Sequence, residues 1–68
     1  MSLHKYRIDF SALTTDEKPE LIDRIESMSF NGLFWHSDFQ SADFFVDESF
    51  NLDYLKIPNI CHPIRIYQ

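Results

Sequence analysis

The sequence contains very little cysteine, glycine or proline. Its 68 residues include one cysteine, one glycine and three prolines. A single cysteine cannot form an internal disulfide, so the chain lacks the cross-links of small secreted domains and is expected to be cytoplasmic. One glycine also excludes a glycine-rich phosphate-binding loop and a flexible glycine-rich linker.

Long hydrophobic runs are also missing. No uncharged stretch approaches the roughly 20 residues that a membrane span needs, and Arg7 and Asp9 interrupt the region where a signal peptide would be apolar. We therefore expect no membrane association. A chain of 68 residues is close to the lower size limit for one self-sufficient core, so a single domain over residues 1–68 is predicted.

Aromatic and acidic residues, in contrast, are abundant. Seven Phe, three Tyr and one Trp make up 16% of the chain and 44% of the residues are hydrophobic, which favours a folded domain over disorder. Eleven Asp and Glu against six Lys and Arg give a formal net charge of −5. This charge disfavours nonspecific attraction to nucleic acid or anionic membranes, and it favours basic partners or simple solubility.

Apolar residues that alternate with polar ones predict four strands. Tyr6, Ile8 and Phe10 alternate with charged residues and indicate a first strand over residues 4–10. The same period of two predicts strands over residues 33–37 and 42–47, joined as a hairpin, and a last strand after Pro63 that contains Ile64 and Ile66.

One amphipathic helix is predicted between the first two strands. Apolar residues from Leu21 to Met28 recur at helical spacing, with charged residues mostly on the opposite side. Thr14 and Glu17 have the spacing of a capping box. Thr15 or Asp16 is nevertheless preferred as the N-cap, because a proline at position 19 is best tolerated in the first turn.

The resulting order is β-α-β-β-(short α)-β, because residues 49–56 allow only a short helix or 3₁₀ turn before Pro58. This order predicts an α+β fold with one main helix on a small antiparallel sheet, and it resembles a compressed ferredoxin-like split βαβ arrangement. A plain βαββ sheet with an irregular tail is the alternative. The predicted core comprises Tyr6, Ile8, Phe10, Leu21 or Ile22, Ile25, Met28, Leu33, Trp35, Phe44, Val46, Leu55, Ile64 and Ile66.

Acidic and aromatic residues are interleaved in the middle of the chain, where no Lys or Arg occurs between Arg24 and Lys56. Carboxylates steer a basic partner and exposed aromatic rings supply buried anchors. We therefore predict a noncatalytic interaction protein, an adaptor or inhibitor, that binds a basic protein surface, with nucleic-acid mimicry as one form of this activity. A solvated acidic edge that discourages aggregation is the plainer interpretation. The predicted partner-binding residues are Asp38, Phe39, Asp43, Phe45, Asp47, Glu48, Phe50 and Asp53.

A nucleic-acid-binding module is the alternative function. Alternation places basic and aromatic residues on the sheet face away from the helix, an arrangement on which RNA-binding folds stack bases. The basic-Gly-aromatic motif of those folds is missing, and Asp43 and Asp47 flank Phe45. Contact between two copies through Phe34 and Phe45, giving a homodimer, is favoured over base stacking. The residues predicted for nucleic-acid binding are Lys5, Arg7, Phe34, Phe45, Arg65 and Tyr67.

No catalytic or metal-binding motif occurs in the sequence. His36 and Asp38 are two residues apart on one face, which supplies too few ligands for a metal site. Cys61 and His62 are neighbours in a segment expected to be extended before Pro63, so their side chains should point to opposite sides, and Cys61 should pack as a small apolar residue. We expect no enzymatic activity, no metal and no cofactor.

Overall fold

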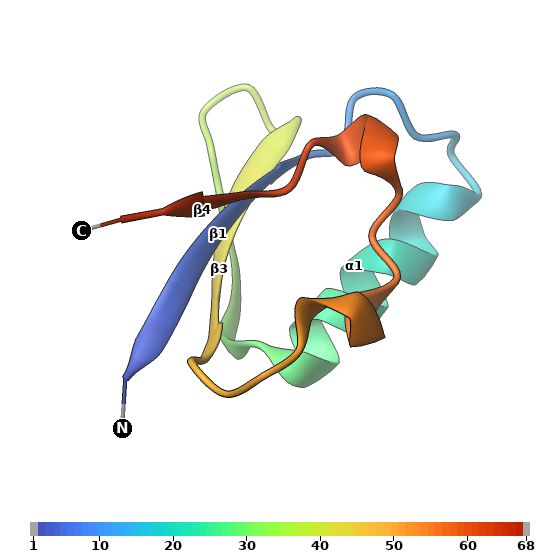
Figure 1. Ribbon diagram of the computed structural model, residues 1–68. Helices are drawn as coiled ribbons and strands as arrows, with labels where there is room; N and C mark the ends of the chain where they lie inside the picture. Colours follow the sequence, from blue (N-terminus) through green and yellow to red (C-terminus); the bar gives the residue numbers. More distant parts are fainter. Residues whose placement is uncertain (1, 68) are drawn as a thin grey trace.

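The computed structural model describes residues 2–67. Two short 3₁₀ turns, η1 (Leu52–Leu55) and η2 (Asn59–Cys61), connect the third strand to the last. Figure 1 shows the other elements, which are β1 (Leu3–Asp9), α1 (Glu17–Met28), β2 (Phe30–Trp35), β3 (Ser41–Asp47) and β4 (Ile64–Ile66). The predicted α+β class, the helix and the hairpin of β2 and β3 are confirmed.

The strands form one antiparallel sheet in the order β2-β3-β1-β4. Because each neighbour is antiparallel, β1 and β2 run in the same direction with β3 between them, and α1 makes the connection. In the same way β3 and β4 run in one direction with β1 between them. Figure 1 shows α1 and both 3₁₀ turns on one side of the sheet. The other face is covered by no element of residues 2–67.

Helix α1 begins after a reciprocal pair of hydrogen bonds. The N–H of Glu17 donates to Thr14 Oγ1 at 3.2 Å, and the N–H of Thr14 donates to Glu17 Oε1 at 3.1 Å. These are the bonds of a capping box. Asp16 precedes the helix as predicted, but its side chain makes no capping bond. Pro19 therefore lies in the first turn of the helix, where a proline is tolerated, and the capping side chain is that of Thr14.

The core lies between α1 and the covered face of the sheet. Seven predicted core residues are buried, and Ala42 and Cys61 join them. Burying a side chain as large as that of Phe44 stabilises the fold by roughly 2 kcal/mol. Met28, in the last turn of α1, and Trp35 were predicted to be buried but are 56% and 37% exposed. The buried hydrophobic residues are Ile8, Phe10, Leu21, Ile25, Ala42, Phe44, Val46, Leu55 and Cys61.

Strand β4 faces the opposite way from the prediction. Its pairing with β1 places Ile64 opposite Arg7 and Ile66 opposite Lys5. Directly opposed residues share a sheet face, so both isoleucines lie on the uncovered face, and Ile64 is 53% exposed. The prediction that Ile64 and Ile66 belong to the core is wrong. Alternation establishes that two residues share a face, but only the register decides which face it is.

Arg65 and Tyr67 are corrected by the same register. Arg65 lies opposite Tyr6, whose side chain packs against the core, so Arg65 is on the helix side of the sheet edge. Its guanidinium carbon lies 4.3 Å from the centroid of the Tyr67 ring, which places the two side chains together. The nucleic-acid hypothesis requires both residues to lie on the uncovered face, and neither does.

Strand β2 starts earlier than residue 33 because it contains a bulge. Asn31 and Gly32 adopt left-handed backbone conformations, with φ values of 64° and 73°. The pairing with β3 consequently jumps from Phe30 opposite Phe45 to Leu33 opposite Phe44. Phe30 is thereby added to the uncovered face of the sheet.

Candidate functional site

The uncovered face is organised in two rows that cross all the strands. We use the name uncovered face for these two rows together with the opposed pairs at the two ends, Leu3 with Asp47 and Asp9 with Ser41, and His36. The first row, from β2 to β4, is Phe34, Asp43, Arg7 and Ile64, and the second is Phe30, Phe45, Lys5 and Ile66. In each row an aromatic ring lies at one end and an isoleucine at the other.

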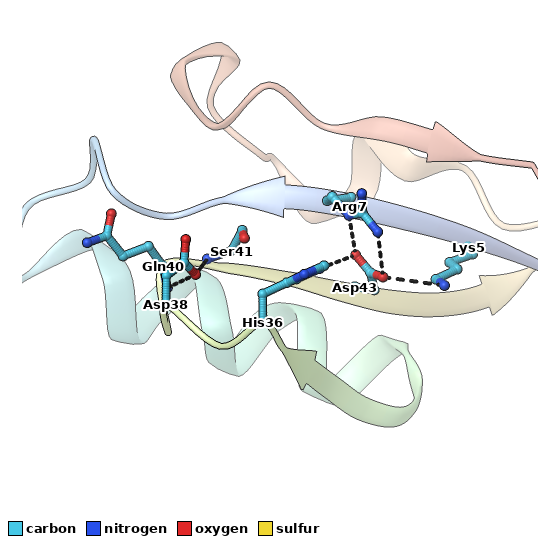
Figure 2. Close-up of polar contacts among 7 residues, drawn as sticks. All are labelled: Lys5, Arg7, His36, Asp38, Gln40, Ser41 and Asp43. Atoms are coloured by element: carbon cyan, nitrogen blue, oxygen red, sulfur yellow. Dashed lines mark hydrogen bonds and ion pairs between the residues drawn. The ribbon is translucent and has the colours of Figure 1, made fainter.

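Asp43 lies at the centre of an ion-pair network on this face (Figure 2). Arg7, on the neighbouring strand β1, donates from Nε to Asp43 Oδ1 at 2.8 Å and from Nη2 to Oδ2 at 3.2 Å. Lys5 Nζ lies 3.4 Å from Oδ2, and His36 Nε2 lies 2.9 Å from Oδ1. Both carboxylate oxygens are therefore bonded, and the cations come from the strand directly beside Asp43.

The network keeps Asp43 ionised although the residue is only 7% exposed. Burial by itself raises the pKa of the carboxyl group, but the hydrogen bonds from Arg7 and His36 outweigh this and lower the pKa from 3.8 to about 2. The same hydrogen bond raises the pKa of Arg7. The centre of the uncovered face therefore carries paired charges at neutral pH.

Aromatic rings lie beside this network. Phe34 and Phe45 pack edge to face with their ring centroids 5.6 Å apart, and Lys5 Nζ is 5.9 Å from the centroid of Phe45. Phe34 is 48% and Phe30 is 54% exposed, although both are large and apolar. Apolar side chains gathered on one exposed face are typical of an interaction surface.

The predicted partner-binding residues occupy three separate regions. Asp43 and Phe45 lie on the uncovered face, whereas Asp38 and Phe39 lie in the loop between β2 and β3. Asp38 Oδ1 accepts hydrogen bonds from the backbone N–H groups of Gln40 and Ser41 at 3.0 and 3.4 Å (Figure 2), and the Phe39 side chain is exposed.

The remaining predicted residues lie at or after the opposite end of β3. They are Asp47, Glu48, Phe50 and Asp53. Six residue steps along β3 separate the two ends by about 20 Å. The residues that the sequence groups together therefore do not form one continuous surface, because a strand spreads its neighbours along its length.

Sequence reasoning missed four apolar residues of the uncovered face. Ile64 and Ile66 had been assigned to the core, and Phe30 and Leu3 to no strand. The Asn-Gly pair before residue 33 could have indicated the bulge that brings Phe30 onto this face. Nothing in the local pattern of β4 could have chosen the face of its isoleucines.

Neither a metal site nor a thiolate-imidazole pair is assembled within residues 2–67. No group of three or more His, Cys, Asp or Glu side chains there is placed to hold a metal ion. His36 bonds to Asp43 rather than meeting Asp38. His62 is exposed while Cys61 is buried. The extended conformation predicted for His62 is wrong, because this residue caps η2 in the left-handed conformation with φ 47°.

A shallow hollow lies beside the two 3₁₀ turns. Its volume is about 170 Å³, below the roughly 300 Å³ at which ordinary ligand pockets begin. The acidic and basic side chains that line it are Asp53 and Lys56. This hollow contains none of the groups of the Asp43 network.

Comparison with protein-family models, with curated proteins and with solved structures finds no match for the chain. The site must therefore be interpreted from its own chemistry. No helix within residues 2–67 has both the length and the apolar character needed to cross a membrane. The geometry defines a small α+β domain with one uncovered sheet face, and Glu48 and Asp53 follow the end of β3.

Proposed function

We propose that the chain is a noncatalytic interaction protein, an adaptor or inhibitor, that binds a basic protein surface. One observation carries this proposal. Every ion pair within residues 2–67 involves Asp43, so none of the other ten carboxylates is paired with a Lys or Arg of that range. Unpaired carboxylates at the surface produce a long-range negative potential that attracts positively charged proteins.

The binding surface in this proposal is the acidic end, which comprises Asp47, Glu48, Phe50, Asp53 and Tyr54. The ring centroids of Phe50 and Tyr54 are 6.2 Å apart, and Tyr54 is 72% exposed. The hydroxyl and backbone N–H of Ser49 bond to Asp47 and lower the pKa of its carboxyl group, which therefore stays charged. Steering by the carboxylates followed by burial of Tyr54 is the proposed mechanism.

A matched pair of charge reversals tests this function. In the test variant Glu48 and Asp53 become Lys, and in the control variant Glu20 and Asp23, exposed on α1, undergo the same change. Each variant and the unchanged protein are used for affinity capture from the native cell, with quantitative mass spectrometry. We expect a basic protein to be captured by the unchanged protein and the control but lost by the test variant.

Kinetics with the captured protein provide the second readout. The association rate at low salt should fall about tenfold or more in the test variant, with a weaker dependence on salt. Equal rates for the test and control variants would contradict the proposal. A nucleic-acid-handling protein among the specific partners would favour mimicry of nucleic acid.

Two narrower statements accompany this function. We propose that the fold is a compressed ferredoxin-like arrangement, supported by the order β2-β3-β1-β4 and by η1 and η2 in place of a second helix. An experimental structure with another strand order would contradict this. A cytoplasmic location is supported by the free, buried Cys61 and is tested by cell fractionation.

A further inference from the structure

The uncovered face has two apolar stripes with paired charges between them. Phe30, Phe34 and Phe45 form an aromatic stripe on β2 and β3, while Ile64 and Ile66 form an aliphatic stripe on β4. The two side chains at the ends of the first row are each about half exposed, with 48% for Phe34 and 53% for Ile64. A face of this kind fits another apolar surface better than it fits water.

The charges on the uncovered face nearly cancel. Lys5 and Arg7 stand against Asp9, Asp43 and Asp47, a net charge of −1, whereas the whole chain carries −5. Two copies of the chain therefore repel each other less through this face than through the rest of their surfaces. Covering the centre of the face strands no unpaired charge, because both oxygens of Asp43 are already bonded, whereas Asp9 and Asp47 lie at the two ends of the central strands.

We propose that the occupant of the uncovered face is a second copy of this chain, which forms a homodimer by stacking sheet on sheet. The twofold axis runs roughly along the strands and passes between β1 and β3. This axis reverses each row, so Phe34 of one copy meets the partner's Ile64, and Asp43 meets the partner's Arg7. Phe30 and Phe34 of each copy are thus packed on the aliphatic stripe of the other, and Phe45 lies over the partner's Lys5.

The size of the face determines the strength of this dimer. Three strands about 20 Å long and the shorter β4, of about 10 Å, spaced about 4.8 Å apart, present a flat area of roughly 340 Å² per copy. A standard stable interface buries about 800 Å² on each partner. The dimer should therefore dissociate on dilution, with a Kd of about 10 µM to 1 mM. A third layer on the sheet would also stabilise a chain this small.

Sedimentation equilibrium over about 10 µM to 1 mM protein tests the proposal. The mass should rise from 8.1 kDa toward twice that value. Added salt should strengthen the association, because it screens the repulsion between two acidic bodies. Binding to a basic protein or to nucleic acid would show the opposite salt dependence.

Two variants with the same chemical change localise the interface. Phe34→Asp lies on the uncovered face, and Phe39→Asp lies in the β2–β3 loop at 71% exposure. Phe34→Asp should weaken dimerisation at least about tenfold, whereas Phe39→Asp should leave it unchanged. Circular dichroism checks that each variant is folded, and Ile64→Asp replaces Phe34→Asp if the latter is not.

Isotope-filtered NMR of the mixed dimer tests the axis. Contacts between Phe34 and the partner's Ile64 are expected, and contacts between Phe34 and the partner's Phe34 would overturn the proposed arrangement. A monomer at every concentration, or equal dimerisation of the two Asp variants, would overturn the dimer itself. Binding of a single-stranded decanucleotide that is lost in Phe34→Asp would instead assign the face to nucleic acid.

The dimer and the proposed binding to a basic partner are tested at different residues, although Asp47 belongs to both surfaces. The dimer test changes the uncovered face, and the partner test changes Glu48 and Asp53 at the acidic end. A monomeric protein that still binds its basic partner would refute only the dimer. A dimer whose captured proteins are insensitive to charge reversal at Glu48 and Asp53 would refute only the partner proposal.

Discussion

Arg7 and Asp43 lie directly opposite each other on β1 and β3, and two hydrogen bonds of 2.8 and 3.2 Å join their side chains. The pair spans the two central strands of the sheet. The pair therefore joins β1, which precedes α1, to β3, which belongs to the hairpin after α1. A cross-strand pair with two parallel hydrogen bonds fixes which residues of the two strands lie opposite each other, and it also stabilises that pairing.

Replacing Asp43 with Asn should lower the free energy of unfolding by about 2 kcal/mol. The amide removes the negative charge between Arg7 and Lys5 and points a donor at groups that also donate. Urea unfolding followed by circular dichroism measures the loss. Asp23→Asn, at an exposed position on α1, is the control and should change stability by less than about 0.5 kcal/mol. Equal losses in the two variants would contradict a stabilising role for the network.

Stability should decrease in acid as Asp43 is protonated. Its pKa is about 2 in the folded chain against 3.8 without the network, so the unfolded chain binds the proton first as the pH falls. The contribution of Asp43 is present above pH 4 and is lost between about pH 4 and pH 2, and it amounts to at most about 2 kcal/mol.

Asp43→Asn separates this effect from that of other carboxylates. The pKa values of Asp9, Glu17 and Asp47 are also lowered, by hydrogen bonds from nearby N–H and hydroxyl groups, and they titrate in both proteins. Urea titrations at a series of pH values should therefore show the stability difference between the two proteins shrinking from pH 5 to pH 2. A constant difference across this window would show that Asp43 does not have a lowered pKa.

The bulge of β2 leads to a third prediction. Gly32 has φ 73°, and a Cβ built on it would meet Glu26 Oε2 at 3.5 Å, an ordinary contact distance. Gly32→Ala should therefore destabilise the fold by about 1 kcal/mol through backbone strain alone. Asn31→Gly, at the neighbouring position with φ 64°, should be neutral or slightly stabilising. Thermal unfolding measures both, and two changes of the same sign and size would contradict this explanation.

How far the sequence predicts the structure depends on whether a feature is local. The helix, the hairpin and the alternation of Ile8 and Phe10 follow from periodicity within single segments. The pairing of β4 with β1 joins residues 57 to 61 positions apart, and alternation cannot choose between its two faces. The ion pairs of Asp43 depend on the same long-range register, with 36 positions between Asp43 and Arg7.

The candidate site was less predictable for the same reason. The sequence identified Phe34, Phe45 and Asp43 as residues of the sheet face, but it treated Asp43 as a free carboxylate. Whether a charge is free or paired is a property of neighbouring strands, not of neighbouring residues. The composition gives the net charge of −5, but it does not indicate that the charges at the centre of one face are paired.

The last prediction concerns the thiol of Cys61, which is fully buried. Burial, and then the carboxylates of Asp9 and Glu17, raise the pKa of this thiol, so both exposure and thiolate content are low in the folded chain. Its reaction with Ellman's reagent should be about 100-fold or more slower than in urea, since an opening free energy of about 3 kcal/mol limits access. A Thr15→Cys variant adds an exposed thiol to the same chain and should give one fast and one slow phase. Two fast phases in the folded variant would contradict the burial of Cys61 and with it the position of η2 against β1.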